Sequence, residues 1–193
     1  METLMVDMDN VITDGLFINL IEEFYNKKID LNSINNYYFV QELTRERNKE
    51  FWEYVSTKNF YGDAPLLDGC YEVLEKLNSM YDIYIATSYL WNEIIDLSGK
   101  NLMDKYIYLK DNLPFIEPEK YIFVTNKNLL NFDIRIDDKI SNLNEANTKL
   151  LFTAWHNKNV SAEKLNLSNI KRVNNWYEIE EELITKKLER KIK

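Results

Sequence analysis

The feature that most constrains this chain is a short apolar run near its N-terminus that leads directly into two carboxylates. Leu4, Met5 and Val6 form the run, and Asp7 and Asp9 follow it. An apolar run bounded by turn residues is typical of a buried strand in a parallel sheet. Aspartate is disfavoured in strands, and a buried carboxylate without a partner is costly. Two carboxylates that leave the same strand therefore indicate a bound cation and a reaction.

The rest of the chain alternates between short apolar runs and stretches in which apolar residues recur at helical spacing. This alternation predicts an α/β fold, Rossmann-like, with a mostly parallel sheet flanked by helices. Strands are expected over residues 4–6, 82–86, 121–124, 134–136, 150–153 and 170–173. Helices are expected over residues 17–25, 45–56, 69–80, 91–103 and 176–190. Asp68 is a plausible N-cap for the third helix, and residues 15–65 form a small helical unit inserted after the first strand.

Four of the expected strands end in residues that can carry chemistry. These residues are Asp7 and Asp9, Thr87 and Ser88, Lys127, and Asp137 and Asp138. Ligands of open α/β sheets bind outside the carboxyl ends of the strands. We therefore expect all four groups to meet at one edge of the sheet.

Composition excludes several kinds of site. The 193 residues carry a formal net charge of −8, which argues against a nucleic-acid groove. The single cysteine, Cys70, excludes an internal disulfide framework, and the single histidine, His156, excludes a multi-histidine metal site within one chain. No signal-peptide pattern and no apolar run of membrane-spanning length is present, so we expect a cytoplasmic protein that does not bind membranes.

The expected cluster suits Mg²⁺ and a phosphate ester. Asp7, Asp9 and Asp137 offer hard oxygen ligands, and Mg²⁺ typically takes one or two carboxylates, water and a substrate phosphate. Phosphoryl transfer depends mainly on positioning and charge neutralisation, and a carboxylate is the available nucleophile. Lys127 is well placed to neutralise a phosphoryl oxygen. Three other lysines could do so instead, namely Lys110, Lys120 and Lys139.

These residues resemble, in order, the four motifs of the haloacid dehalogenase-like (HAD) phosphatases. More closely, the chain is similar to the 5′(3′)-deoxyribonucleotidases over nearly its whole length. This second resemblance rests on Asp7-Met8-Asp9 with Asp14, Trp52-Glu53, Lys58-Asn59-Phe60, Pro65 before Gly69, Ala86-Thr87-Ser88, Ile136-Asp137-Asp138 and the run from Leu151 to Asn157. It implies a HAD core of residues 1–14 and 66–193 and a small helical cap of residues 15–65.

The resemblance also implies roles for individual residues. Asp7 would be the nucleophile and a Mg²⁺ ligand. Asp9 would protonate the leaving alkoxide, then activate water, and bind Mg²⁺ through its backbone carbonyl. Lys127 would screen Asp7 from the phosphate. The remaining implied positions are Thr87 and Ser88 for phosphate oxygens, and Asp137 and Asp138 for the metal site.

The resulting hypothesis is a Mg²⁺-dependent phosphomonoesterase that dephosphorylates (deoxy)nucleoside monophosphates through an aspartyl-phosphate. Two alternatives stay open: a phosphatase for another small ester, such as a sugar phosphate, and a non-catalytic binder of nucleotide or phosphate with the same fold. Phe39 and Trp52 could line the substrate pocket or fill the interior of the cap. The expected partner is a small phosphate ester, and the cap aromatics could also serve an interface in a homo-oligomer.

Several residues depart from the pattern of the family or fall outside it. Asn10 stands where relatives usually have glycine, and asparagine tolerates an unusual φ better than most residues. Gly15 stands where the nucleotidases have an aromatic residue that stacks on the base. Asp133 and His156 are expected to be structural. Arg135 is expected near an exposed part of the sheet, with no role in chemistry.

Overall fold

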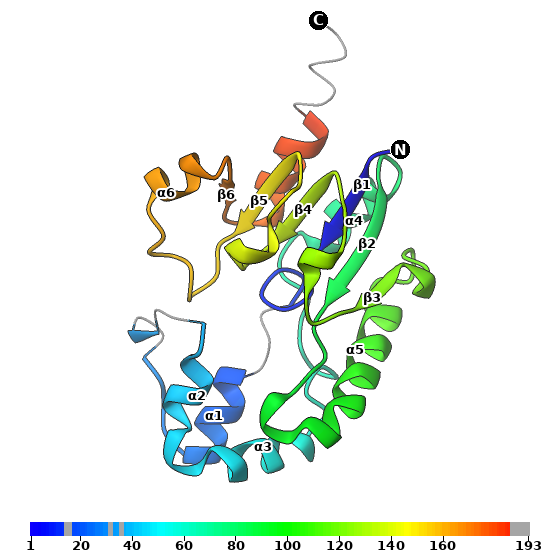
Figure 1. Cartoon of the computed structure of the whole chain (residues 1–193). Helices are drawn as coiled ribbons and strands as arrows, with labels where there is room; N and C mark the ends of the chain where they lie inside the picture. Colours follow the sequence, from blue (N-terminus) through cyan, green and yellow to red (C-terminus); the bar gives the residue numbers. More distant parts are fainter. Residues whose placement is uncertain (14–16, 31–32, 35–36, 186–193) are drawn as a thin grey trace, which may run out of the picture.

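The computed structural model describes residues 1–13, 17–30, 33–34 and 37–185 (Figure 1). In these residues the strands form one six-stranded sheet in the order β3-β2-β1-β4-β5-β6, and each neighbouring pair is parallel. The strands are β1 (Thr3–Val6), β2 (Asp82–Thr87), β3 (Tyr121–Phe123), β4 (Ile134–Asp137), β5 (Thr148–Phe152) and β6 (Lys171–Val173). The predicted α/β fold with a mostly parallel sheet is confirmed.

β1 lies in the middle of the sheet, and its side chains alternate between the two faces. Leu4 and Val6 are buried in the main core, which also includes residues of α4 (Cys70–Asn78) and α7 (Trp176–Glu180). Met5 is buried in a smaller cluster on the opposite face. The strand that carries the two carboxylates is therefore covered on both faces, as its unbroken apolar run predicts.

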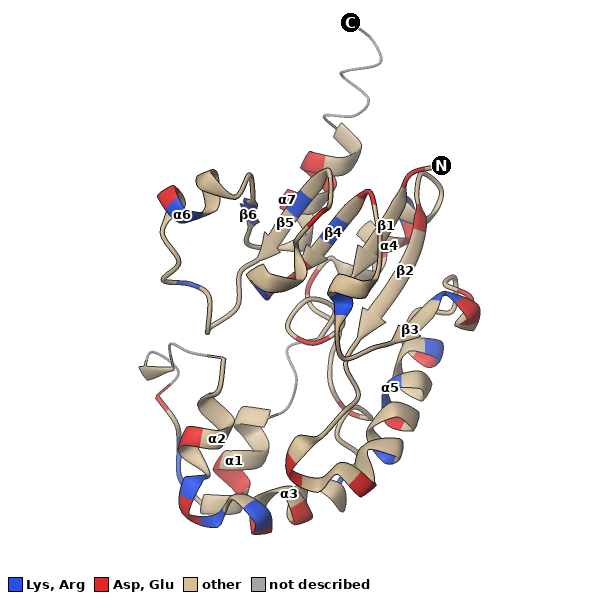
Figure 2. Cartoon of the chain, viewed as in Figure 1, with Lys and Arg blue, Asp and Glu red and all other residues tan. Residues whose placement is uncertain are grey.

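Between β1 and α4, the described residues form several short helices. They are α1 (Phe17–Tyr25), α2 (Phe39–Leu43), a 3₁₀ turn, η2 (Arg45–Arg47), and α3 (Asn48–Ser56). In Figure 1, α1, α2 and α3 lie together beyond the carboxyl ends of the strands. Acidic and basic residues are interspersed along α3 and α5 (Figure 2), as on solvated helix faces. The division into a core and a separate cap of residues 15–65 stays a prediction.

The helix predicted over residues 91–103 is wrong at both ends. The chain instead forms a 3₁₀ segment, η3 (Asn92–Leu97), in which Ile94 is non-helical, and then the long helix α5 (Ser98–Asn112). The Trp91 backbone N–H donates to the Ser98 hydroxyl at 2.9 Å, which ties the 3₁₀ segment into a loop before α5 begins. This side-chain contact overrides the helical spacing of the apolar residues before Ser98.

The bounds of other helices also differ from the predictions. Asp68 is not the N-cap of α4, because Gly69 precedes the helix with φ +73°, a conformation that glycine adopts without strain. After α7 the chain continues as a π-helical turn to Thr185, and the rest of the predicted helix lies outside the described residues, as do Asp14 and Gly15. The remaining elements are η4 (Pro118–Lys120), η5 (Lys127–Leu129), η6 (Ile140–Asn142) and α6 (Ala162–Leu167). Across the described ranges, no helix has both the length and the apolarity needed to cross a membrane.

Arg135 contradicts the expectation of an exposed position, because it is only 1% exposed at the centre of β4. Its guanidinium donates to the Asn142 carbonyl at 2.8 Å and to the Leu130 carbonyl. These carbonyls lie at the ends of η6 and η5. The buried arginine therefore links the turn that carries Lys127 to the turn that follows Asp137.

Arg135→Met is expected to lower the free energy of unfolding by about 2 kcal/mol, because two part-buried carbonyls lose their donors. Urea denaturation at neutral pH measures the loss. Lys149 is the residue paired with Arg135 on β5 and is half-buried, so Lys149→Met is a matched control that should cost much less. Equal losses in the two variants would contradict the linking role of Arg135.

Candidate active site

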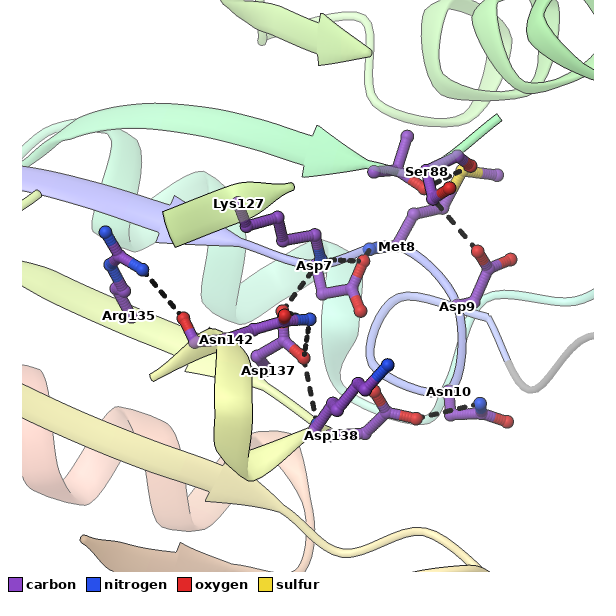
Figure 3. Close-up of polar contacts among 12 residues, drawn as sticks. Asp7, Met8, Asp9, Asn10, Ser88, Lys127, Arg135, Asp137, Asp138 and Asn142 are labelled. Atoms are coloured by element: carbon purple, nitrogen blue, oxygen red, sulfur yellow. Dashed lines mark hydrogen bonds and ion pairs between the residues drawn. The ribbon is translucent and has the colours of Figure 1, made fainter. Parts of the chain in front are cut away.

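Asp7 follows β1 directly and lies at the carboxyl edge of the sheet. Its backbone N–H donates to the Ile136 carbonyl on β4 at 2.9 Å. Its Oδ1 accepts from the Met8 backbone N–H at 2.7 Å and lies 2.6 Å from Lys127 Nζ (Figure 3). The carboxylate is thus fixed in direction by the backbone on one side and by a lysine on the other.

Three buried carboxylates meet at this edge. Asp7, Asp137 and Asp138 each place an oxygen within 4.8 Å of the others. Burial, followed by repulsion from Asp137, raises the pKa of Asp7 to about 7. Burial also raises the pKa values of Asp137 and Asp138. The cluster carries more negative charge than one lysine neutralises, and its oxygen-only donors suit a divalent cation such as Mg²⁺.

Lys127 is the lysine that reaches the cluster. Its Nζ lies 2.6 Å from Asp7 Oδ1 and 2.7 Å from Asp137 Oδ2, and the residue is 4% exposed. Burial lowers the pKa of Lys127, but Asp137 and Asp7 together raise it by more. The three alternative lysines have other surroundings. Lys120 pairs with Asp82 at 2.6 Å, and Lys110 is exposed. Lys139 lines the same pocket, but its Nζ lies over the Tyr37 ring.

Asn142 belongs to the site but was missed by sequence reasoning. Its Nδ2 lies 3.0 Å and 3.2 Å from the two Asp137 carboxylate oxygens. The Lys139 backbone N–H also donates to Asp137 Oδ1, at 2.9 Å. An asparagine in a short turn carries no distinguishing pattern, and only the 3₁₀ conformation of η6 brings this one back to the carboxylate.

Asp138 has its own set of partners. Its Oδ2 lies 2.8 Å from His156 Nε2 and accepts from Asn10 Nδ2 at 2.9 Å. The predicted structural role of His156 therefore includes orienting a carboxylate of the cluster. Asn10 has φ 59°, as expected for a residue at a glycine-like turn position. Asp133 is structural as predicted, since it accepts from the backbone N–H and hydroxyl of Thr3.

The Asp9 side chain points away from the carboxylate cluster (Figure 3). Its Oδ2 lies 2.5 Å from Lys105 Nζ, and its Oδ1 accepts from the Tyr61 hydroxyl at 2.7 Å. Lys105 also donates to the Thr87 hydroxyl at 2.7 Å, so Asp9 and Thr87 share one cation. Lys105 was not predicted because the expected helix ended before it. The available sequence signal was its spacing along α5 from other buried residues, namely Asn101, Tyr108 and Leu109.

A pocket of about 420 Å³ opens over these residues. Its polar lining includes Asp7, Asp9, Ser88, Lys127 and Asp138. Its aromatic lining comes from the helical segment and from the core, and consists of Phe17, Tyr37, Tyr38, Phe39, Trp52, Trp91 and Trp155. Phe39 and Trp52 are also nearly fully buried, so each lines the pocket and fills the interior of the helical segment.

The fold is that of the HAD hydrolases. The structure is similar to that of the HAD-hydrolase YfnB from Bacillus subtilis bound to magnesium, with a TM-score of 0.54, 15% sequence identity and coverage of 95% of this chain and 98% of that chain. This likeness shows the fold. The model of the family described as 5′ nucleotidase, deoxy (Pyrimidine), cytosolic type C protein matches residues 1–189, and the chain belongs to this family.

Named relatives agree with the family. The chain is 29% identical over 181 residues to the 5′(3′)-deoxyribonucleotidase of Clostridium acetobutylicum, with 91% of each chain covered. It is 26% identical over 189 residues to the 5′(3′)-deoxyribonucleotidase of Bacillus subtilis, with 95% of this chain and 99% of the relative covered. The protein is therefore an enzyme, a phosphoric monoester hydrolase of the nucleotidase type.

Mg²⁺ is expected to raise the thermal unfolding midpoint more at about pH 8 than at about pH 5.5. The pKa of Asp7 rises from 3.8 to about 7 on folding. The folded protein therefore binds a proton between these values, and its stability falls as the pH rises through them. A bound cation replaces that proton and removes the penalty. Scanning fluorimetry with and without Mg²⁺ measures the shifts, and an equal rise at both pH values would contradict the prediction.

Proposed function

We propose that the protein hydrolyses deoxyribonucleoside monophosphates with Mg²⁺ through an aspartyl-phosphate. The observation that carries this proposal is the separation in space of two carboxylates that lie close together in sequence, with Met8 between them. Asp7 lies beside Lys127 in the buried cluster, whereas Asp9 is held outside it by Lys105 and Tyr61. One carboxylate can thus attack phosphorus while the other transfers protons.

Asp7, Asp137 and Asp138 would hold Mg²⁺, together with the backbone carbonyl of Asp9. The fit is supported by the three buried carboxylates, whose pKa values are raised first by burial and then by repulsion from one another, a repulsion that a cation would offset. Hydrogen bonds from Asn142 to Asp137 keep one of these ligands in place. The bound ion supplies charge neutralisation for the phosphoryl oxygens.

Two half-reactions follow from this arrangement. An oxygen of Asp7 attacks phosphorus, the bond from phosphorus to the ester oxygen breaks, and Asp9 gives a proton to that oxygen. A water molecule then attacks phosphorus, Asp9 takes a proton from the water, and the bond from phosphorus to Asp7 breaks. Lys127 offsets the charge of the phosphoryl group, and Thr87 and Ser88 hold its oxygens. The products are an alcohol and inorganic phosphate, and the Asp7 carboxylate is restored.

The aromatic wall of the pocket supports a nucleotide as the substrate. The centroids of the Phe39 and Trp155 rings lie 4.0 Å apart, and those of Trp52 and Trp91 lie 5.9 Å apart. A flat base can pack on such rings while its phosphate lies at Asp7. The relatives from Clostridium acetobutylicum and Bacillus subtilis are named 5′(3′)-deoxyribonucleotidases. The helical segment of residues 15–65 would act as a cap that excludes water during the reaction.

The test is phosphate release, with Mg²⁺ or with EDTA, from a panel of deoxyribonucleoside, ribonucleoside and sugar monophosphates. We expect Mg²⁺-dependent turnover that is fastest on deoxyribonucleoside monophosphates and is restored when Mg²⁺ is added back after EDTA. Turnover confined to sugar phosphates would reject the nucleotide substrate and keep the reaction. A folded protein that releases phosphate from none of them would contradict the proposed reaction.

A further inference from the structure

Lys105 is a buried lysine that approaches the site from α5, apart from the carboxylate cluster. It is 2% exposed, and its Nζ lies 2.5 Å from Asp9 Oδ2, 2.7 Å from Thr87 Oγ1 and 2.5 Å from the Ser88 carbonyl oxygen. An ammonium group has three N–H donors, and these contacts use all of them. Burying such a group is costly unless it is paired and hydrogen-bonded, so the contacts fix its position.

These contacts join two groups that come from different parts of the sheet edge. Asp9 belongs to the turn after β1, and Thr87 is the last residue of β2. The Tyr61 hydroxyl donates to the other oxygen of Asp9, so both oxygens of this carboxylate are held. A carboxylate on a turn would otherwise rotate about its side-chain bonds. Thr87 Oγ1 lies 3.5 Å from Asp9 Oδ2, and Lys105, which donates to both oxygens, holds the two groups together.

We propose that Lys105 is a positioning residue that holds Asp9 where its proton reaches the leaving oxygen. This inference rests on the proposed hydrolase function. In the step concerned, the bond from phosphorus to the ester oxygen breaks as the bond to Asp7 forms, and the proton passes from Asp9 to the ester oxygen. Lys105 keeps its own protons throughout and acts through Asp9 and Thr87.

Lys105→Met tests this role, because methionine has a similar shape and no charge or donor. The variant is assayed with Mg²⁺ on a deoxyribonucleoside monophosphate and on p-nitrophenyl phosphate. The nucleoside alkoxide must take up a proton as it leaves, whereas the nitrophenolate leaves without one. We expect kcat to fall about 100-fold on the nucleotide and less than about tenfold on the nitrophenyl ester. The ratio of the two rates does not depend on the fraction of folded protein. Equal losses on both esters would overturn the proposal.

Two comparisons make the test sharper. Lys110 is exposed on the same helix, and Lys110→Met should leave both rates within about twofold. Lys105→Gln is polar, but its side chain is one bond shorter, uncharged and has only two N–H donors for the three partners of Lys105, so it should show the same selective loss on the nucleotide if Lys105→Met does not fold. A loss of similar size on both esters in Lys105→Gln would overturn the proposal.

A double variant tests whether Lys105 acts through Asp9. Adding Lys105→Met to Asp9→Asn should lower kcat on the nucleotide by less than about threefold, because the proton donor is already absent. A further loss of about 100-fold would overturn the proposal. Failure of the proposed hydrolase function gives a different result from failure of the Lys105 proposal, because the unmodified protein would then release no phosphate from either ester. The Lys105 proposal would fall with the hydrolase function in that case.

Discussion

Asp7→Asn is expected to lower kcat on the preferred nucleotide by about 10⁴-fold or more. The amide cannot form the bond to phosphorus. Asp137 and Asp138 cannot replace Asp7, because neither lies at the end of β1, where the proposed nucleophile is held. Asparagine has nearly the same shape as aspartate, and its amide oxygen can still accept from the Met8 backbone N–H. The variant should therefore keep its fold and its pocket. Phosphate release and the thermal unfolding midpoint measure the two effects separately.

The control for this prediction is Asp63→Asn, which makes the same chemical change at an exposed position. It should leave kcat and the unfolding midpoint unchanged. Binding of the nucleotide to Asp7→Asn, measured by calorimetry, shows whether the pocket is intact. Turnover by Asp7→Asn at more than about a tenth of the normal rate would show that the aspartyl-phosphate mechanism is wrong.

Lys127→Met is expected to destabilise the Mg²⁺-free protein by about 3 kcal/mol at neutral pH, because Asp7 and Asp137 lose the cation that contacts both of them. It is also expected to lower kcat by about 100-fold, since the phosphoryl charge is no longer offset. The destabilisation should be smaller at about pH 5. The pKa of Asp7 is about 7, so this carboxyl group is neutral in the folded protein at the lower pH.

Lys120→Met is the matched control for the stability measurement. Lys120 pairs with Asp82 at 2.6 Å, nearly the distance from Lys127 to Asp7, but its side chain is 27% exposed. Water screens this second pair, so its loss should change the urea midpoint far less. Similar losses in the two variants, or the same loss for Lys127→Met at both pH values, would contradict the account of the buried cluster.

The positions of the polar residues at the strand ends could be predicted from the sequence. Apolar runs followed by polar residues predicted a parallel sheet with Asp7, Thr87, Lys127 and Asp137 at one edge, and the structure places them there. This succeeds because the direction of parallel strands follows from their connections, so every strand ends on the same side. The roles of these residues in catalysis and metal binding stay proposals until the variants are measured.

The sequence analysis missed Lys105 and Tyr61, which hold Asp9. Each is a long side chain that reaches the site from a segment far from Asp9 in sequence. Neither follows a strand, so the rule about strand ends does not apply to them. The predicted helix ended at residue 103, before Lys105, whereas α5 continues to Asn112. The Trp91–Ser98 hydrogen bond accounts only for the shifted start of α5, a tertiary contact that local periodicity does not contain.

Arg135 shows the opposite kind of error. A charged residue inside an apolar strand was expected to be near solvent, because burying a guanidinium is costly. The cost is offset here by two carbonyl groups at the ends of short turns, which come from either side of β4 in the sequence. One of those turns carries Lys127 and the other carries Asn142, so the site depends on a residue that does not touch its pocket.

The amino-acid sequence alone was sufficient for the α/β fold, for helices between β1 and α4, and for the four groups of polar residues at the sheet edge, because each follows from periodicity and strand direction. Tertiary structure was needed to separate Asp9 from the buried cluster and to pair it with Lys105. It was also needed to select Lys127 among the lysines and to bury Arg135. These outcomes depend on contacts between segments distant in sequence, whose desolvation costs and hydrogen bonds are balanced only when the whole chain is folded.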